Sequence, residues 1–172
     1  MRWIALTLLA VALAVAAFLA WLGAFSPVVI EERPIGPYSF AYRELPGATP
    51  ADVGRVTGEL VAELEAAGAT ELRPLGVYAP DGSAQIGVAV GAGIEKAGGL
   101  PNVSVRELVA ERGLVATFQW RMPISFLVAY LKVNPAFERY RELKGYEIAP
   151  AWVLLEGGAI VNMMPITARP EP

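Results

Sequence analysis

The sequence predicts an α+β fold: a duplicated β-α-β-β unit, with its two halves about a pseudo-twofold axis, behind one N-terminal transmembrane helix. Two observations predict it. The N-terminus carries a long apolar stretch, and a pattern of strand, helix and hairpin then occurs twice along the chain. Duplicated halves usually leave a groove at their junction, and small-molecule sites are commonly concave. The pattern therefore also predicts where a ligand would bind.

The stretch from Trp3 to Phe25 contains no charged side chain. As a helix it would rise about 1.5 Å per residue and roughly match a hydrocarbon core of about 30 Å. Trp3 and Trp21 lie near its two ends, where indole rings favour the membrane interface. We therefore predict that residues 1–25 form a single membrane-spanning anchor.

The alternative is a cleavable signal peptide. The apolar run is longer than an ordinary signal core, and the cleavage candidate Ala24-Phe25-Ser26 is followed directly by a proline, so an uncleaved anchor is favoured. Arg2 and the terminal amine favour an N-terminus in the cytoplasm, which places the following domain outside it. Arg33 and Arg43, beyond the apolar stretch, weaken that bias.

Residues 26–37 are rich in proline and are predicted to form an extended spacer. Residues 38–172 are predicted to form the ligand-binding domain. Its first strand is marked by Tyr38, Phe40 and Tyr42, which alternate with other residues and so share one face. The strand of the second half is predicted over residues 114–120.

The first helix is predicted over residues 49–67. Thr49 can cap it, and Asp52 complements the positive end of the helix. Gly54 and Gly58 lie one turn apart and lower the helix propensity. They leave two interpretations open, a close contact between helix and sheet or a surface left open beside a groove.

The second helix is predicted over residues 124–143, and its apolar side chains form two stripes. One consists of Ile124, Leu127, Val128 and Leu131, and the other of Phe126, Tyr130, Val133 and Phe137. We therefore expect this helix to be buried on a broad face. Asn134-Pro135 is expected to break or restart it, because proline has no N–H to donate.

Each helix is followed by a predicted hairpin. The first turns at Asp81-Gly82 and the second at Gly157-Gly158, each between short apolar stretches. The glycine-rich residues 91–102 connect the halves. They lack the spacing of a phosphate-binding loop and are interpreted as a linker.

The composition excludes several kinds of chemistry. The chain has no cysteine and no histidine, which removes thiol nucleophiles, disulfides and the usual general base near neutral pH. We expect no metal site and no cofactor. Arg2 is the one charge in the anchor, so the rest of the chain carries 13 basic and 17 acidic residues, a net charge of −4. This balance gives no support for nucleic-acid binding.

Several short motifs resemble the gyrase-inhibitor-like (GyrI-like) small-molecule-binding domain. They are Thr117-Phe118, Ser125, Val133-Asn134-Pro135-Ala136-Phe137, Tyr140 and Met164-Pro165-Ile166. Within that family the chain is most similar to the membrane-anchored branch that includes a testis-expressed autophagy receptor of the endoplasmic reticulum. The first half of that branch is resembled by Ala41-Tyr42 and Val77-Tyr78. The likeness extends from Tyr38 to Ile166.

The resemblance implies an effector-binding domain of two β-α-β-β halves, with a groove at their junction that takes bulky aromatic, often cationic molecules. Many relatives place a glutamate two residues ahead of a tyrosine in the strand before the last turn, and this acid faces the groove. The matching positions here are Val153 and Leu155. Their apolar character implies weak selectivity for cations, and it argues against the acid-dependent hydrolysis reported for a few relatives.

We therefore expect a membrane-anchored, non-catalytic module that binds an apolar or aromatic small molecule in its groove. The candidate ligand-binding residues are Tyr42, Tyr78, Trp120, Trp152, Val153 and Leu155. Aromatic side chains supply large contact areas with polar tips, although for each the alternative is a place in the core. Two other functions stay open: a scaffold that holds a protein partner and, less favoured, a hydrolase of electrophilic small molecules with a base other than histidine.

Overall fold

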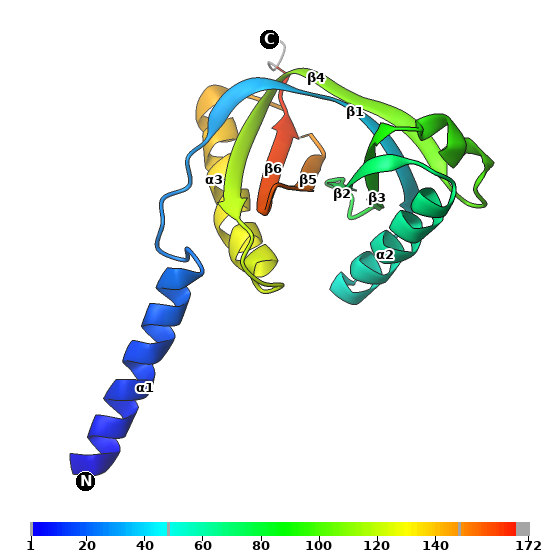
Figure 1. Ribbon diagram of the computed structural model, residues 1–172. Helices are drawn as coiled ribbons and strands as arrows, with labels where there is room; N and C mark the ends of the chain where they lie inside the picture. The colour runs from blue at the N-terminus through cyan, green and yellow to red at the C-terminus, as the bar shows by residue number, and fades with distance from the viewer. Residues whose placement is uncertain (1, 48, 148, 168–172) are drawn as a thin grey trace.

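The computed structural model describes residues 2–47, 49–147 and 149–167. Its elements in chain order are α1 (Arg2–Trp21), β1 (Glu31–Glu44), α2 (Pro50–Ala66), β2 (Thr70–Tyr78), β3 (Ala84–Ala92), the short 3₁₀ helix η1 (Ile94–Gly99), β4 (Ser104–Gln119), α3 (Ser125–Lys144), β5 (Ala151–Glu156) and β6 (Ala159–Pro165). Figure 1 shows the long strands β1 and β4 arching together over the domain, with α2 and α3 below them and α1 leaving as a separate helix.

The strands form a closed antiparallel barrel in the order β1-β3-β2-β5-β6-β4. The first half contributes β1-β3-β2, and the second contributes β4-β6-β5 in the corresponding order. The halves meet where β1 pairs with β4 and where β2 pairs with β5. Closure gives every strand an inner face, and an apolar cluster that includes Phe40, Leu75 and Leu154 fills the interior. The predicted α+β class is confirmed.

The helices α2 and α3 cover separate parts of the outer barrel surface. Leu60 and Leu64 of α2 pack in a cluster with residues of β3, and Val133 and Phe137 of α3 pack in a cluster with residues of β4 and β6. The predicted start of α2 is confirmed. The Thr49 side chain accepts a hydrogen bond from the Asp52 N–H, and the Asp52 carboxylate accepts one from the Thr49 N–H.

The long strands begin earlier than the sequence predicted. β1 starts at Glu31 rather than Tyr38, so residues 31–37, expected to belong to a spacer, are part of the sheet. Glu31 pairs with Val115 of β4, and the register shifts on both sides of Ile35. Such irregularities tolerate proline because some residues there make no ladder hydrogen bond. Likewise, β4 starts at Ser104 instead of 114.

The expectations for α3 need two corrections. The helix runs unbroken through Pro135. Proline leaves the carbonyl four residues earlier without its partner, and both Pro135 and Leu131 lie on the exposed face, where that carbonyl can be hydrated. The helix is also not buried on a broad face. It buries the narrow row Ser125, Ala129, Val133, Phe137 and Arg141, while the large apolar residues of its first turns are exposed.

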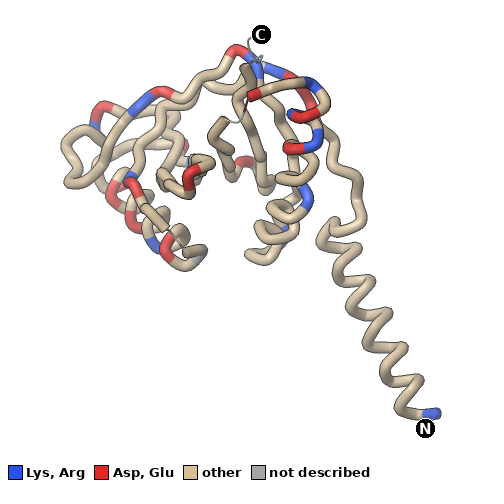
Figure 2. Tube along the Cα trace, turned by 180° about the vertical axis from the view of Figure 1, so that it is seen from behind, with Lys and Arg blue, Asp and Glu red and all other residues tan. Residues whose placement is uncertain are grey.

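All residues of α1 are exposed, and the helix is long and apolar enough to cross a membrane. Figure 2 shows α1 without a charged residue apart from Arg2 at its N-terminal end, whereas the charges of the chain lie on the domain. The chain therefore joins a lipid-compatible helix to a domain whose surface carries the charged residues.

Candidate functional site

Four residues of β2 and β5, of which Tyr78 is exposed, Val153 and Leu155 are half-buried and Gly76 is buried, form a strip on the outer barrel surface where the two halves meet. We call Gly76, Tyr78, Val153 and Leu155 the β2–β5 strip. Gly76 pairs directly with Val153, and residues two apart on a strand share a face. The intervening residues, such as Val77 and Leu154, point into the barrel interior and are buried.

Tyr78 lies across the floor of the strip. A Cβ placed on Gly76 would stand 2.9 Å from the Tyr78 hydroxyl oxygen and 2.9 Å from a ring carbon, so only glycine leaves room for the ring there. Tyr78 is 37% exposed, yet burial of its hydroxyl end raises the pKa of that group above its ordinary value. The strip thus presents an aromatic ring whose hydroxyl lies beside Gly76.

The first wall of the strip is α2. On this helix Val56 and Leu60 face the sheet, and Arg43 of β1 pairs with Glu63 at 2.7 Å on the side away from β2. Helical geometry then turns Gly54 and Thr57 toward β2. A Cβ added at Gly54 or Gly58 would meet no atom within 4 Å. The close contact between helix and sheet, one of the two interpretations left by the sequence, is therefore wrong.

The second wall is α3, whose buried row separates two sides. Lys132 lies on the side that meets the end of α1, because its Nζ donates to the Gly23 carbonyl at 2.9 Å. Phe126 and Tyr130 lie on the opposite side of the row, toward β5, and are 38% and 62% exposed. Figure 1 shows β2 and β5 between α2 and α3, in agreement with these two walls.

Trp120 stands at the end of this second wall. Its ring meets Phe126 edge to face with centroids 5.0 Å apart. The backbone N–H of Trp120 donates to the Gly158 carbonyl at 3.0 Å, which connects this residue to the β5–β6 turn. The structure therefore places three of the candidate ligand-binding residues, Tyr78, Val153 and Leu155, on one surface, and it places Trp120 beside Phe126 of the second wall.

The other two candidates lie inside the barrel. Trp152 is 6% exposed and belongs to the interior cluster. Tyr42 packs against the same cluster and stacks on Phe40 at 5.0 Å between centroids, with the Arg106 guanidinium 5.4 Å from its ring centroid. The alternation along a strand could show that these residues share faces with other aromatic residues. It could not show which face becomes the interior when the sheet closes.

Asn162 is a site residue that the sequence reasoning missed. It pairs with Val153 on one side and Ala116 on the other, is 6% exposed, and its Nδ2 has no hydrogen-bond partner among the described residues. A buried amide without a partner is costly, and this one lies directly beside Val153 of the strip. One signal was available, since Asn162 is the polar residue in the otherwise apolar run Ala159–Met164.

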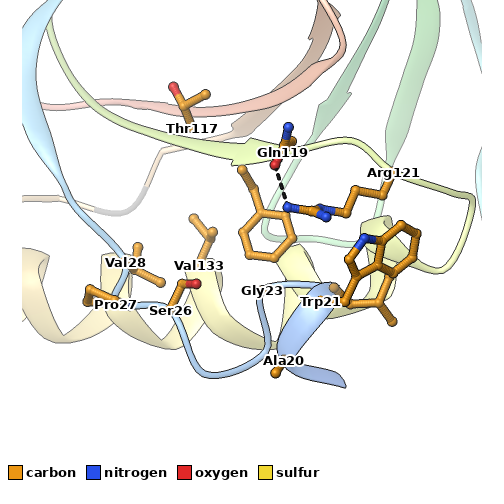
Figure 3. Close-up of a pocket in the computed structure, with 12 residues that line it drawn as sticks. Ala20, Trp21, Gly23, Ser26, Pro27, Val28, Thr117, Gln119, Arg121 and Val133 are labelled. Atoms are coloured by element: carbon orange, nitrogen blue, oxygen red, sulfur yellow. Dashed lines mark hydrogen bonds between the residues drawn. The ribbon is translucent and has the colours of Figure 1, made fainter. Parts of the chain in front are cut away.

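A separate cavity of about 240 Å³ lies where α1 meets the domain (Figure 3). Its lining comes from the end of α1, the segment after it, the end of β4 and Val133 of α3. Arg121 is the one charged residue of the lining. Its guanidinium donates to Gln119 Oε1 at 2.8 Å and lies 5.0 Å from the centroid of the Trp21 ring. This cavity belongs to the junction with α1 and not to the β2–β5 strip.

Solved structures with the same fold include the C-terminal domain of EcmrR, with a TM-score of 0.60 and 11% identity, covering 83% of this chain and 99% of that one. A hydrolase from Listeria innocua has a TM-score of 0.54 and 12% identity, covering 87% and 98%. SAV2435 bound to tetraphenylphosphonium has a TM-score of 0.51 and 11% identity, covering 81% and 94%.

At these identities the likeness shows the fold alone. No family model and no curated protein matches the sequence, so nothing supports the finer resemblance to the receptor of the endoplasmic reticulum. The structural neighbours are consistent with the GyrI-like small-molecule-binding fold that the sequence motifs resemble.

Proposed function

We propose that this chain is a membrane-anchored module that binds an apolar or aromatic small molecule on the β2–β5 strip, and that it is not an enzyme. The observation that carries the proposal is the partly exposed Tyr78 ring packed against Gly76 beside Val153, between two helices. A flat aromatic ligand could stack on such a surface. That SAV2435 is bound to tetraphenylphosphonium, a bulky aromatic cation, supports the aromatic character of the ligand.

The charge of the site favours neutral ligands. The strip itself and the wall residues Gly54, Thr57, Phe126 and Tyr130 are uncharged. A cation that left water for this surface would lose hydration without gaining a nearby anion. We therefore assign the site to neutral aromatic molecules, with the Tyr78 hydroxyl and the Asn162 amide as hydrogen-bonding groups at its edge.

The chemistry of these residues supports binding without catalysis. The chain contains no histidine or cysteine. Tyr78 is the titratable group of the strip, and its raised pKa keeps it protonated near neutral pH, so it can donate a hydrogen bond but cannot act as a base.

The architecture supports the same proposal. We infer that the halves are duplicated copies about a pseudo-twofold axis, because β1 corresponds to β4, β3 to β6 and β2 to β5, and corresponding strands pair with each other at both junctions. The strip then lies at the axis.

The test is calorimetric titration of the full chain in phosphatidylcholine nanodiscs, with empty nanodiscs subtracted. The ligands are a neutral coumarin dye and its trimethylammonium derivative. We expect the neutral dye to bind more tightly. Gly54→Phe should fill the open space beside the strip and weaken binding by about ten-fold or more. It should not unfold the helix, since a Cβ meets nothing there and glycine is the poorer helix former.

The matched control is Ala62→Phe, which adds the same ring to an exposed position of α2 on the side away from the sheet. We expect it to leave the affinity unchanged. Equal affinity of the Gly54→Phe and Ala62→Phe variants for the neutral dye would overturn the placement of the site.

A further inference from the structure

The first turns of α3 carry an unusual exposed surface. From Met122 to Leu131 the chain has no charged residue, while Arg121 and Lys132 stand directly at its two ends. Ile124, Phe126, Leu127, Tyr130 and Leu131 in this segment are 43%, 38%, 54%, 62% and 61% exposed. Phe126 and Tyr130 face the strip. The other three point away from the sheet, where the strip does not account for them.

The same part of the domain holds the end of α1. Leu22, which follows α1, is 1% exposed. Lys132 donates to the backbone carbonyls of Gly23 and Ser26, and the Phe118 ring lies close against Gly23. These contacts fix the end of α1 to β4 and α3, so the anchor and the exposed apolar residues belong to one surface.

Trp21 indicates where that surface lies relative to the membrane. This residue ends α1, where an indole favours the interface between lipid and water. The Arg121 guanidinium lies 5.0 Å from the centroid of its ring, and Figure 3 shows the two side chains together. Because Arg121 directly precedes Met122, the exposed segment starts at the level of the interface. Figures 1 and 2 agree that the first turns of α3 lie beside the end of α1.

We propose that Ile124, Leu127 and Leu131 dock onto the surface of the lipid bilayer beside α1, with their side chains in the interfacial region. The bilayer is the occupant that the contacts favour, since α1 leads into it from the same surface. The flanking Arg121 and Lys132 suit this place, because long basic side chains keep their apolar stems in lipid while their charges reach the headgroups. The inference rests on the membrane-anchored part of the proposed function and not on ligand binding.

The chain contains no cysteine, so a fluorophore can be placed at single sites in the full protein. Leu127→Cys reports on the proposed contact. Leu143→Cys, at a residue 80% exposed near the other end of α3, is the matched control, and Leu9→Cys reports on α1. Each variant carries the environment-sensitive dye NBD and is reconstituted in phosphatidylcholine nanodiscs with and without lipid spin-labelled near the headgroup. A thermal melt confirms folding.

We expect spin-labelled lipid to lower the emission at positions 9 and 127 by about two-fold or more relative to unlabelled nanodiscs, and to leave position 143 unchanged. Quenching at position 9 with position 127 behaving like 143 would overturn the docking while keeping the anchor. Quenching at none of the three would overturn both. Shielding of position 127 from aqueous iodide without quenching by lipid would mean that protein covers the surface, which also overturns the proposal.

Discussion

The two halves of the domain each lay a helix on the barrel, but the outward faces of these helices differ. In α2 this face carries small and charged residues, and its ion pairs include Arg55 with Glu59 at 2.9 Å. Glu63 ties the helix to Arg43 of β1 at 2.7 Å. In the first turns of α3 the corresponding surface carries Leu127 and Leu131. No large apolar residue of α2 is exposed among those that the structure describes.

The difference separates two demands that a helix must meet. The inner face must fill the space above the barrel, and both helices do this with a row of fully buried side chains. The outer face must suit the surrounding medium, and a charged face suits water while an apolar one does not. The shared fold therefore sets only the inner face. The outer face of α3 reflects its position beside α1.

The largest expected effect tests whether the inner faces are equivalent. Leu60 of α2 is 0% exposed and Phe137 of α3 is 1% exposed. Replacing each with alanine removes buried apolar surface and leaves a cavity, which costs about 2–5 kcal/mol for leucine and about 3–5 kcal/mol for phenylalanine. We expect both variants to lose stability in this range in urea unfolding of the full chain. A cost below about 1 kcal/mol for Phe137→Ala alone would mean that α3 is not packed as firmly as α2.

A smaller effect tests the strip, to which the first half contributes Gly76 and Tyr78 and the second half Val153 and Leu155. The double change Val153→Glu with Leu155→Tyr introduces the acid and tyrosine that the resemblance to the GyrI-like family implies at these positions. A carboxylate in a partly buried site attracts a cation more strongly than one in water. We expect the preference between matched cationic and neutral dyes to shift toward the cation by about 1–3 kcal/mol.

The same change should lower the stability of the unliganded protein, because the half-buried carboxylate has no partner. Leu155→Tyr alone is the control, since it adds the ring without the charge. If calorimetric titration gives the same cation affinity for the double and single variants, position 153 does not face the bound ligand.

The sequence predicted the local features of the fold well. The Thr49 cap with Asp52, both hairpin turns and the existence of both main helices depend on neighbouring residues, and the structure contains each of them. The early start of β1 could not be predicted in the same way. Pairing Glu31 with Val115 depends on a partner distant in sequence, and the prolines of the segment conceal the strand pattern.

The candidate site was predictable to the same extent. Val153 and Leu155 could be placed on one face because residues two apart on a strand share a face, whereas Tyr78 joins them only through the pairing of β2 with β5, which is distant in sequence. Tyr42 and Trp152 follow the same rule, but closure of the barrel turns their face inward. The apolar first turns of α3 were expected to be buried, because a sequence pattern identifies an apolar face without identifying what covers it. Only the contacts of Lys132 and Arg121 with the end of α1 show that the long apolar helix lies beside it.

The smallest expected effect concerns the polar contacts that hold each helix to β1. In the first half the tie is the ion pair of Arg43 with Glu63. In the second half Glu32 of β1 accepts hydrogen bonds from Arg112 at 2.7 Å and from the hydroxyls of Tyr140 and Tyr146 at 3.0 Å each. The bond from Arg112, followed by those from the two tyrosines, lowers the pKa of Glu32 below its ordinary value of 4.5, although partial burial opposes the shift.

A carboxyl group with a lowered pKa stabilises the folded state above its ordinary pKa, and this contribution is lost as the pH falls through the lowered value. Glu32→Gln should therefore cost about 1 kcal/mol at pH 7, and the difference from the unchanged protein should shrink as the pH falls below about 4.5. Urea unfolding between pH 7 and pH 3 measures this difference. Glu65→Gln on the exposed face of α2 is the control, and we expect it to change the stability little at any pH. If the loss of stability caused by Glu32→Gln stays constant down to pH 3, the carboxylate charge does not hold the end of α3 to β1. Only the first half would then have an ion pair that stabilises the contact of its helix with β1.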